Sequence, residues 1–125
     1  MSFLFATIGT TQVFAECYTV EGFEGVVSYA GEGSFNNDAL EVTHRFLTGE
    51  NPSVLQGATG YCEAIDNYFF MCFGTSGDEI SATGVYALDP ETGTAWFLQA
   101  RRLPPPMNGL NGIMAMTGKL KEGCG

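Results

Sequence analysis

Residues 61–73 read YCEAIDNYFFMCF, and this stretch decides the fold. Asp66 and Asn67 are turn-forming residues, and strand-forming residues flank them on both sides. A hairpin centred near Asn67 places Cys62 directly across from Cys72, with the two Cβ atoms within reach of a disulfide bond. The stretch therefore predicts an antiparallel hairpin closed by a Cys62–Cys72 bridge.

The other two cysteines, Cys17 and Cys124, lie near the two ends of the chain. We expect them to pair, because the first and last strands of a closed sheet lie side by side. No two cysteines have the C-x-x-C spacing and His44 is the only histidine, so we predict no metal site. Disulfides indicate an oxidising compartment, which predicts a secreted or periplasmic protein. Four buried free thiols in a cytosolic protein are the alternative.

Turn signals and short apolar runs extend this pattern along the chain. Residues 40–46 alternate between apolar and polar side chains, which predicts a strand with one wet face. The sequence Asp89-Pro90-Glu91-Thr92-Gly93 has proline and glycine where a turn needs them, so residues 94–99 are expected to run antiparallel to residues 82–88. We expect a second turn at residues 36–38 and a bulge or bend at Gly84.

Together these elements predict an all-β protein with an antiparallel barrel of about eight short strands. A β-sandwich is the alternative. The barrel is preferred because pairing of Cys17 with Cys124 requires the first and last strands to be adjacent. Residues 16–125 are too few for two domains and are predicted to form a single β-barrel domain.

Residues 1–15 form a weakly apolar run that ends in Val13-Phe14-Ala15. This pattern resembles the tail of a secretory signal peptide with cleavage after Ala15, and a first β-strand is the alternative. The run is shorter than the roughly 20 apolar residues that a membrane-spanning helix needs, so we predict no membrane span.

The composition excludes several classes of partner. The chain has 14 acidic and 5 basic residues and a formal net charge of −9, whereas nucleic acids are bound by clustered Lys and Arg, so nucleic acid is not expected as a partner. Apolar residues make up 45% of the chain, which predicts a folded core. No nucleotide motif is present, and we predict no cofactor.

Three segments carry a family resemblance: Gly60-Tyr61-Cys62, the Cys72 strand followed by Ser76-Gly77-Asp78, and the glycine-rich run of residues 108–118 that ends in Thr117-Gly118. Their order resembles small secreted bacterial proteins of the allene oxide cyclase-like and dirigent-like barrel group, over roughly residues 57–120. The resemblance implies an eight-stranded antiparallel barrel with a lumen. No catalytic residue of that group matches a position here, so the resemblance implies no activity.

Two side chains are candidates for acid–base chemistry. His44 is the only group that titrates unperturbed near neutral pH, and it is in phase with Val42 and Phe46, which would direct it into the lumen. Glu63 is in phase with Tyr61; inside a barrel its pKa would rise, whereas on the outer face it would be solvated. A satisfied structural histidine and a solvated glutamate are the alternatives to catalysis.

Aromatic and methionine side chains are the candidates for ligand binding: Phe69, Met71, Phe73 and Trp96. We expect a secreted binding module for a small apolar molecule or a protein partner, and no enzyme. A cyclase or isomerase of the allene oxide cyclase type, and a structural subunit of an extracellular assembly, are the alternatives. The oligomeric state stays open.

Overall fold

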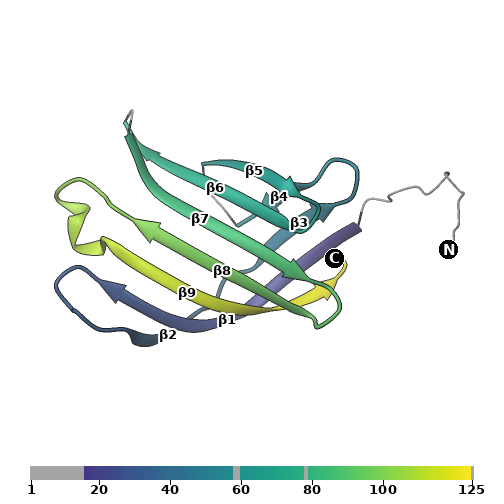
Figure 1. Ribbon diagram of the computed structural model, residues 1–125, viewed down its shortest axis with the longest axis horizontal. Helices are drawn as coiled ribbons and strands as arrows, with labels where there is room; N and C mark the ends of the chain where they lie inside the picture. The colour runs from purple at the N-terminus through teal and green to yellow at the C-terminus, as the bar shows by residue number, and fades with distance from the viewer. Residues whose placement is uncertain (1–15, 58–59, 78, 125) are drawn as a thin grey trace, which may run out of the picture.

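The computed structural model describes residues 16–57, 60–77 and 79–124. These residues form one antiparallel sheet of nine strands that curls into a nearly closed barrel (Figure 1). The strands are β1 (Glu16–Tyr29), β2 (Asn36–Leu40), β3 (His44–Thr48), β4 (Ser53–Gln56), β5 (Tyr61–Asp66), β6 (Phe69–Ser76), β7 (Glu79–Asp89), β8 (Thr94–Arg101) and β9 (Gly112–Glu122).

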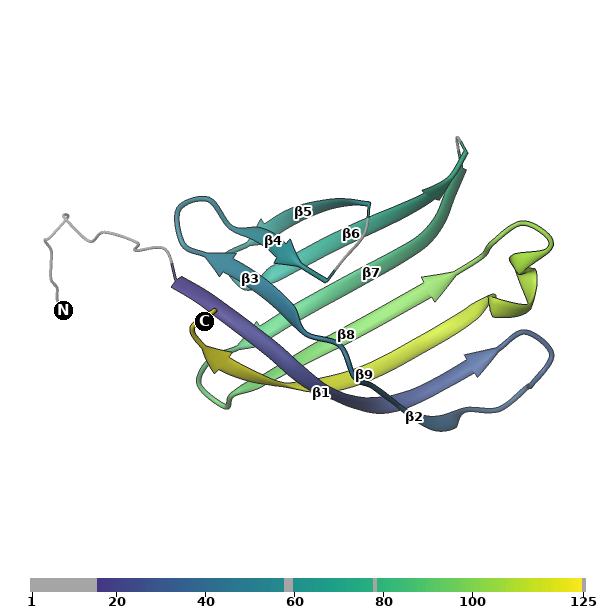
Figure 2. The same cartoon turned by 180° about the vertical axis from the view of Figure 1, so that it is seen from behind.

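Eight of these strands follow one another around the barrel in the order β4-β3-β1-β9-β8-β7-β6-β5. The short strand β2 extends this wall, because it pairs with the second half of β1 while β3 pairs with the first half. The edge strands β4 and β5 come close to each other, which nearly closes the circle (Figure 2). The predicted eight-stranded antiparallel barrel is confirmed.

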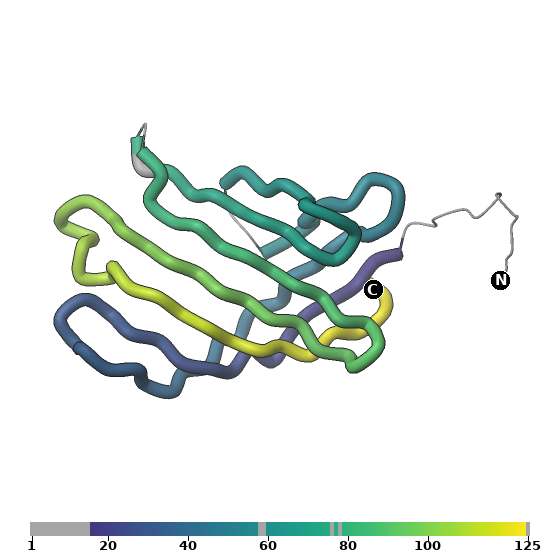
Figure 3. Tube along the Cα trace, in the orientation of Figure 1, coloured from purple at the N-terminus to yellow at the C-terminus, as the bar shows by residue number. Residues whose placement is uncertain are grey.

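Both predicted disulfides are present. In the hairpin of β5 and β6, Cys62 pairs directly with Cys72, and their Cα atoms are 4.0 Å apart. The Cα atoms of Cys17 and Cys124 are 5.5 Å apart. This second bridge lies where the first and last strands, β1 and β9, run side by side (Figure 3). The bridges therefore fix one local hairpin and one junction between distant parts of the chain.

The predicted turn between β7 and β8 is confirmed. The Asp89 carboxylate accepts hydrogen bonds from the Glu91 backbone N–H at 3.2 Å and from the Thr92 hydroxyl at 2.9 Å. Gly93 takes a φ of 70°, which glycine adopts without steric cost. The register that follows pairs residues 82–89 with residues 94–101, as the turn predicted.

Two local predictions were wrong. Residues 36–38 are not a turn, because they belong to β2 and pair with residues 25–27 of β1, so that pairing overrides their turn propensity. Gly84 is not a bulge, because its pairing with Cys72 and Gln99 continues the register of both neighbouring strands. The shift between β6 and β7 lies beyond Gly74 instead.

Inward-facing side chains form a core of aromatic rings at the middle of the barrel. Tyr86 and Phe97 stack with their ring centroids 4.7 Å apart, and Phe46 lies 5.0 Å from Tyr86 and 5.2 Å from Phe70. All four are buried, and this ring cluster closes the interior at mid-height.

The compartment prediction is partly supported: two disulfides are compatible with an extracellular or periplasmic location. Residues 1–15, for which a signal peptide or a first strand was predicted, lie outside the described residues. Within the described part of the chain, no helix is long and apolar enough to cross a membrane.

The two bridges are expected to differ in their contribution to stability. Chain-entropy arithmetic assigns about 5 kcal/mol to a loop of the size closed by Cys17 and Cys124 and about 3 kcal/mol to one of the size closed by Cys62 and Cys72. The sequence separations are 107 and 10 residues. Urea unfolding of the double variants Cys17→Ala/Cys124→Ala and Cys62→Ala/Cys72→Ala should show the larger loss in the first. The opposite order would contradict the assignment of barrel closure to the terminal bridge.

Candidate functional site

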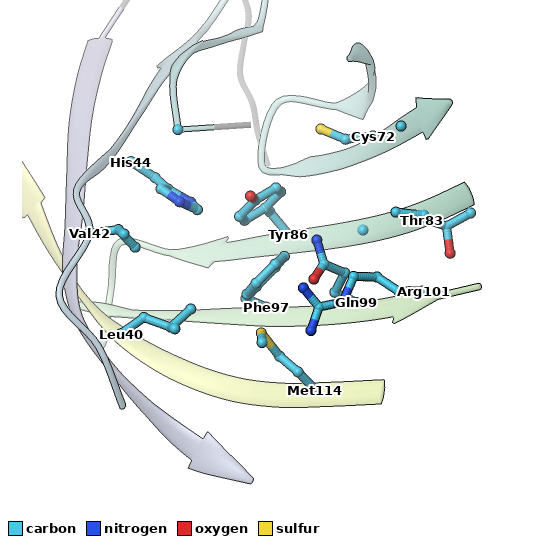
Figure 4. Close-up of a pocket in the computed structure, with 14 residues that line it drawn as sticks. Leu40, Val42, His44, Cys72, Thr83, Tyr86, Phe97, Gln99, Arg101 and Met114 are labelled. Carbon is cyan, nitrogen blue, oxygen red and sulfur yellow. The ribbon is translucent and has the colours of Figure 1, made fainter. Parts of the chain in front are cut away.

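A cavity of about 250 Å³ lies inside the barrel, where strands from both halves of the chain converge (Figure 4). Strands β6, β7, β8 and β9 supply one wall, and the segment from β2 to β3 supplies the other. Its principal lining side chains are Leu40, His44, Tyr86, Phe97, Gln99 and Arg101.

The cavity exists because inward positions in this part of the barrel carry small residues. Gly74 and Gly84 line it where a longer side chain would fill the space, and Ala82 lies between them on the same wall. Two residues beyond Gly84 on β7, the inward position carries the large ring of Tyr86, and Phe97 pairs with Tyr86 on the neighbouring strand β8. The lumen is therefore filled at mid-height and open toward the end where β8 finishes and β9 begins.

His44 projects among the aromatic rings at the floor of this cavity. Its ring centroid lies 4.9 Å from that of Phe23, 5.3 Å from Tyr86 and 6.0 Å from Phe97. Only 6% of the residue is exposed. His44 lines the cavity, so its side chain points into the lumen as the sequence predicted.

The environment of His44 keeps its imidazole neutral at pH 7. Burial lowers the pKa of His44 from its usual value, because the charged form loses its hydration. The buried Nδ1 atom has no hydrogen-bond partner among the described residues. Burial also raises the pKa of Tyr86, so both groups are uncharged at neutral pH. The titratable side chains at the floor of the cavity are thus uncharged, and they lie among aromatic rings.

Gly57 holds the ring of His44 in place from the other side. A side-chain carbon at this position would overlap the imidazole ring, and the backbone φ of Gly57 is 111°, a value that residues with a side chain rarely adopt. The loop after β4 can therefore pack directly on His44 only because residue 57 is glycine.

Two polar residues on β8 face the cavity from the side opposite Gly57. Gln99 and Arg101 follow Phe97 at every second position, so all three point inward (Figure 4). The Arg101 guanidinium lies over the ring of Tyr29, with 5.7 Å between its Cζ atom and the ring centroid. The cavity therefore runs from an apolar aromatic floor to a polar, cationic rim.

Sequence reasoning missed Gln99, Arg101 and Tyr86. The signal was present in the period-two spacing of Phe97, Gln99 and Arg101, since a buried Phe97 fixes the inward phase of the strand. Glu63, the second acid–base candidate, is exposed on the outer face of β5 and does not line the cavity. Of the two candidates, only His44 is in the lumen.

The predicted ligand-binding residues all lie on the outer wall of the barrel. Phe69 and Trp96 are 40% and 47% exposed and line a shallow apolar groove of about 510 Å³ together with Leu98, which is 51% exposed. Met71 and Phe73 share this outer face on β6 and are half-buried. The structure therefore has two candidate binding regions, the lumen and the outer groove.

No protein-family model matches this chain, and neither a curated protein nor a solved structure matches it. The resemblance to the allene oxide cyclase-like barrels thus stays a prediction based on motifs. Across residues 16–57, 60–77 and 79–124, no group of three or more His, Cys, Asp or Glu side chains could hold a metal ion.

Substitution of Gly57 should be costly for two separable reasons. Gly57→Ala is expected to lose about 2–4 kcal/mol of unfolding free energy, from the strained φ and from the overlap with His44. Gly31→Ala is a matched control, because Gly31 has a φ of 88° and open space around it. Chemical denaturation should show a clearly smaller loss for the control. Equal losses would mean that contact with His44 contributes nothing.

Burial of His44 also predicts a pH dependence of stability. The folded-state pKa lies below the unfolded value, so the unfolded chain binds the proton more readily, and stability falls as the pH drops below about 6.5. His44→Leu removes this titration and should reduce the fall in melting temperature between about pH 7.5 and about pH 5.5. Thermal unfolding followed by circular dichroism measures the difference. Parallel pH profiles for both proteins would show that His44 is not the responsible group.

Proposed function

We propose that this protein is a secreted binding protein that holds a small, mostly apolar molecule in the lumen of its barrel. The observation that carries the proposal is the cavity of about 250 Å³, which has aromatic and aliphatic walls and a few polar groups. Ligand sites in proteins have this character: apolar walls supply the affinity, and isolated polar groups fix the orientation. The two disulfides support secretion.

The size and polarity of the cavity limit the ligand. Cavities for drug-sized molecules measure about 300–1,000 Å³, so this lumen suits a smaller molecule. Apolar atoms of Leu40, Phe97 and Met114 face the interior, and Gln99 and Arg101 offer polar contacts near the rim. A slender apolar ligand would contact the apolar walls of the cavity and would need few polar groups of its own.

Binding without catalysis fits the site better than turnover does. A general acid or base works best when its pKa is near the working pH, but burial moves the pKa of His44 further below neutrality. Glu63 lies outside the lumen, which removes the other proposed anchor of a cyclase-type reaction. A cyclase or isomerase would therefore have to act by confinement of its substrate alone.

The outer groove favours a second candidate function, the binding of an apolar protein partner. Phe69, Trp96 and Leu98 come from two different strands and leave about half of their surface in water. Contiguous apolar patches on a protein surface mark interaction sites.

Octanol, as an uncharged probe, tests the lumen by isothermal titration calorimetry. The wild type should bind octanol, and Gly74→Leu should weaken binding by about tenfold or more, because a leucine would extend into the cavity. At Gly74 a side-chain carbon meets only Ala82, at an ordinary distance of 3.6 Å, so the variant should fold. Leu98→Gln is the control for the outer groove and should leave the affinity unchanged.

Trp96 provides an independent readout of the same titration. It is the only tryptophan in the chain, and it lines the outer groove, so its emission should stay constant while octanol fills the lumen. A shift in emission, together with loss of binding in Leu98→Gln and normal binding in Gly74→Leu, would show that octanol binds in the outer groove. This result would overturn the proposal.

A further inference from the structure

We infer that the ligand of the lumen carries a carboxylate, and that Arg101 at the rim of the cavity binds it. This inference rests on the lumen binding proposed above and specifies the chemical class of the ligand. It assigns Arg101 as the head-group contact, with the aromatic floor accepting the apolar tail.

The position of Arg101 is unusual for this acidic chain. The chain has 5 basic and 14 acidic residues, yet a basic residue faces the cavity. Among the described residues that line the cavity, none is aspartate or glutamate. Within the described part of the chain, no ion pair includes Arg101. A guanidinium that faces a partly enclosed space without a carboxylate partner is suited to an anion from solution.

The strands around Arg101 hold its guanidinium at the rim. Arg101 pairs with Ala82 on β7 and with Gly112 on β9, so its neighbours in the wall are small and leave room for a long side chain to turn inward. The ring of Tyr29 on β1 supports the guanidinium from one side through a cation–π contact. Such support reduces the rotamer entropy that Arg101 would lose on binding an anion.

The polarity of the cavity lining changes from the rim to the floor in the way that suits an amphiphilic ligand. Gln99 lies one inward position deeper than Arg101, and its side-chain amide can donate a hydrogen bond to the same anion. Phe97 lies one position deeper again, beside Tyr86 and His44 (Figure 4). Polarity therefore decreases steadily along β8 from the rim to the floor, which matches a short carboxylate with an apolar tail.

A carboxylate fits the available charge better than a phosphate does. A phosphate monoester carries about −1.5 to −2 charges at pH 7 and is usually met by several basic groups or by a helix N-terminus. Arg101 is the one cationic side chain among the described residues of the cavity lining. A single guanidinium matches one carboxylate in charge and in bidentate geometry.

Octanoate and octylamine have chains of equal length and opposite charge, so the order of their affinities tests this inference. A chain with a net charge of −9 should favour octylamine if overall electrostatics governed binding, whereas Arg101 should favour octanoate. We expect calorimetry to give octanoate an affinity about tenfold or more above that of octylamine. Arg101→Met should remove this preference and leave the affinity for octanol within about twofold of the wild type.

Arg102 supplies the matched control. It is the next residue, is exposed, and does not line the cavity, so Arg102→Met changes the net charge equally without touching the site. Arg102→Met should keep the preference for octanoate. If octanol binds but octanoate has no advantage, or if Arg101→Met keeps that advantage, the carboxylate inference is wrong and lumen binding stands. If none of the three probes binds the wild type, both proposals are wrong.

Discussion

Strand β1 pairs with β9 from Tyr18 to Tyr29, and this pairing joins two halves of the barrel that are distant in sequence. One half consists of β1 to β4 and the other of β5 to β9. Gly25 and Gly112 allow the close approach, because a side-chain carbon at either would overlap a backbone carbonyl of the other strand. The lumen depends on this junction, since its two walls come from different halves.

The size of the inward residues then decides how the space inside the barrel is used. Large rings such as Tyr86 and Phe97 fill the middle, while Gly74 and Gly84 leave room beside them. A barrel selected only for stability would fill that space, and it would not bury the Nδ1 of His44 without a partner, which costs about 1–3 kcal/mol. Local departures from good packing that gather in one place are typical of functional sites.

Local signals in the sequence were sufficient for the hairpin of Cys62 and Cys72 and for the Asp89 turn, because both depend on neighbouring residues. They failed at residues 36–38, where pairing with residues 25–27 of β1 outweighs turn propensity. For the site, alternation placed His44 correctly. Residues 68–73 are apolar on both faces, so alternation could not indicate which of them face inward. Only the fold shows that Phe69 faces outward.

The acidic exterior and the cationic rim act over different distances. At physiological ionic strength the Debye length is about 8 Å, so an exposed carboxylate further than this from the cavity mouth is largely screened from a molecule there. Arg101 acts at contact distance and in a partly enclosed space, where screening is weaker. Net charge therefore governs how quickly an anion approaches this protein, whereas the lining of the lumen governs how long it stays. An acidic protein can in this way be selective for an acidic ligand.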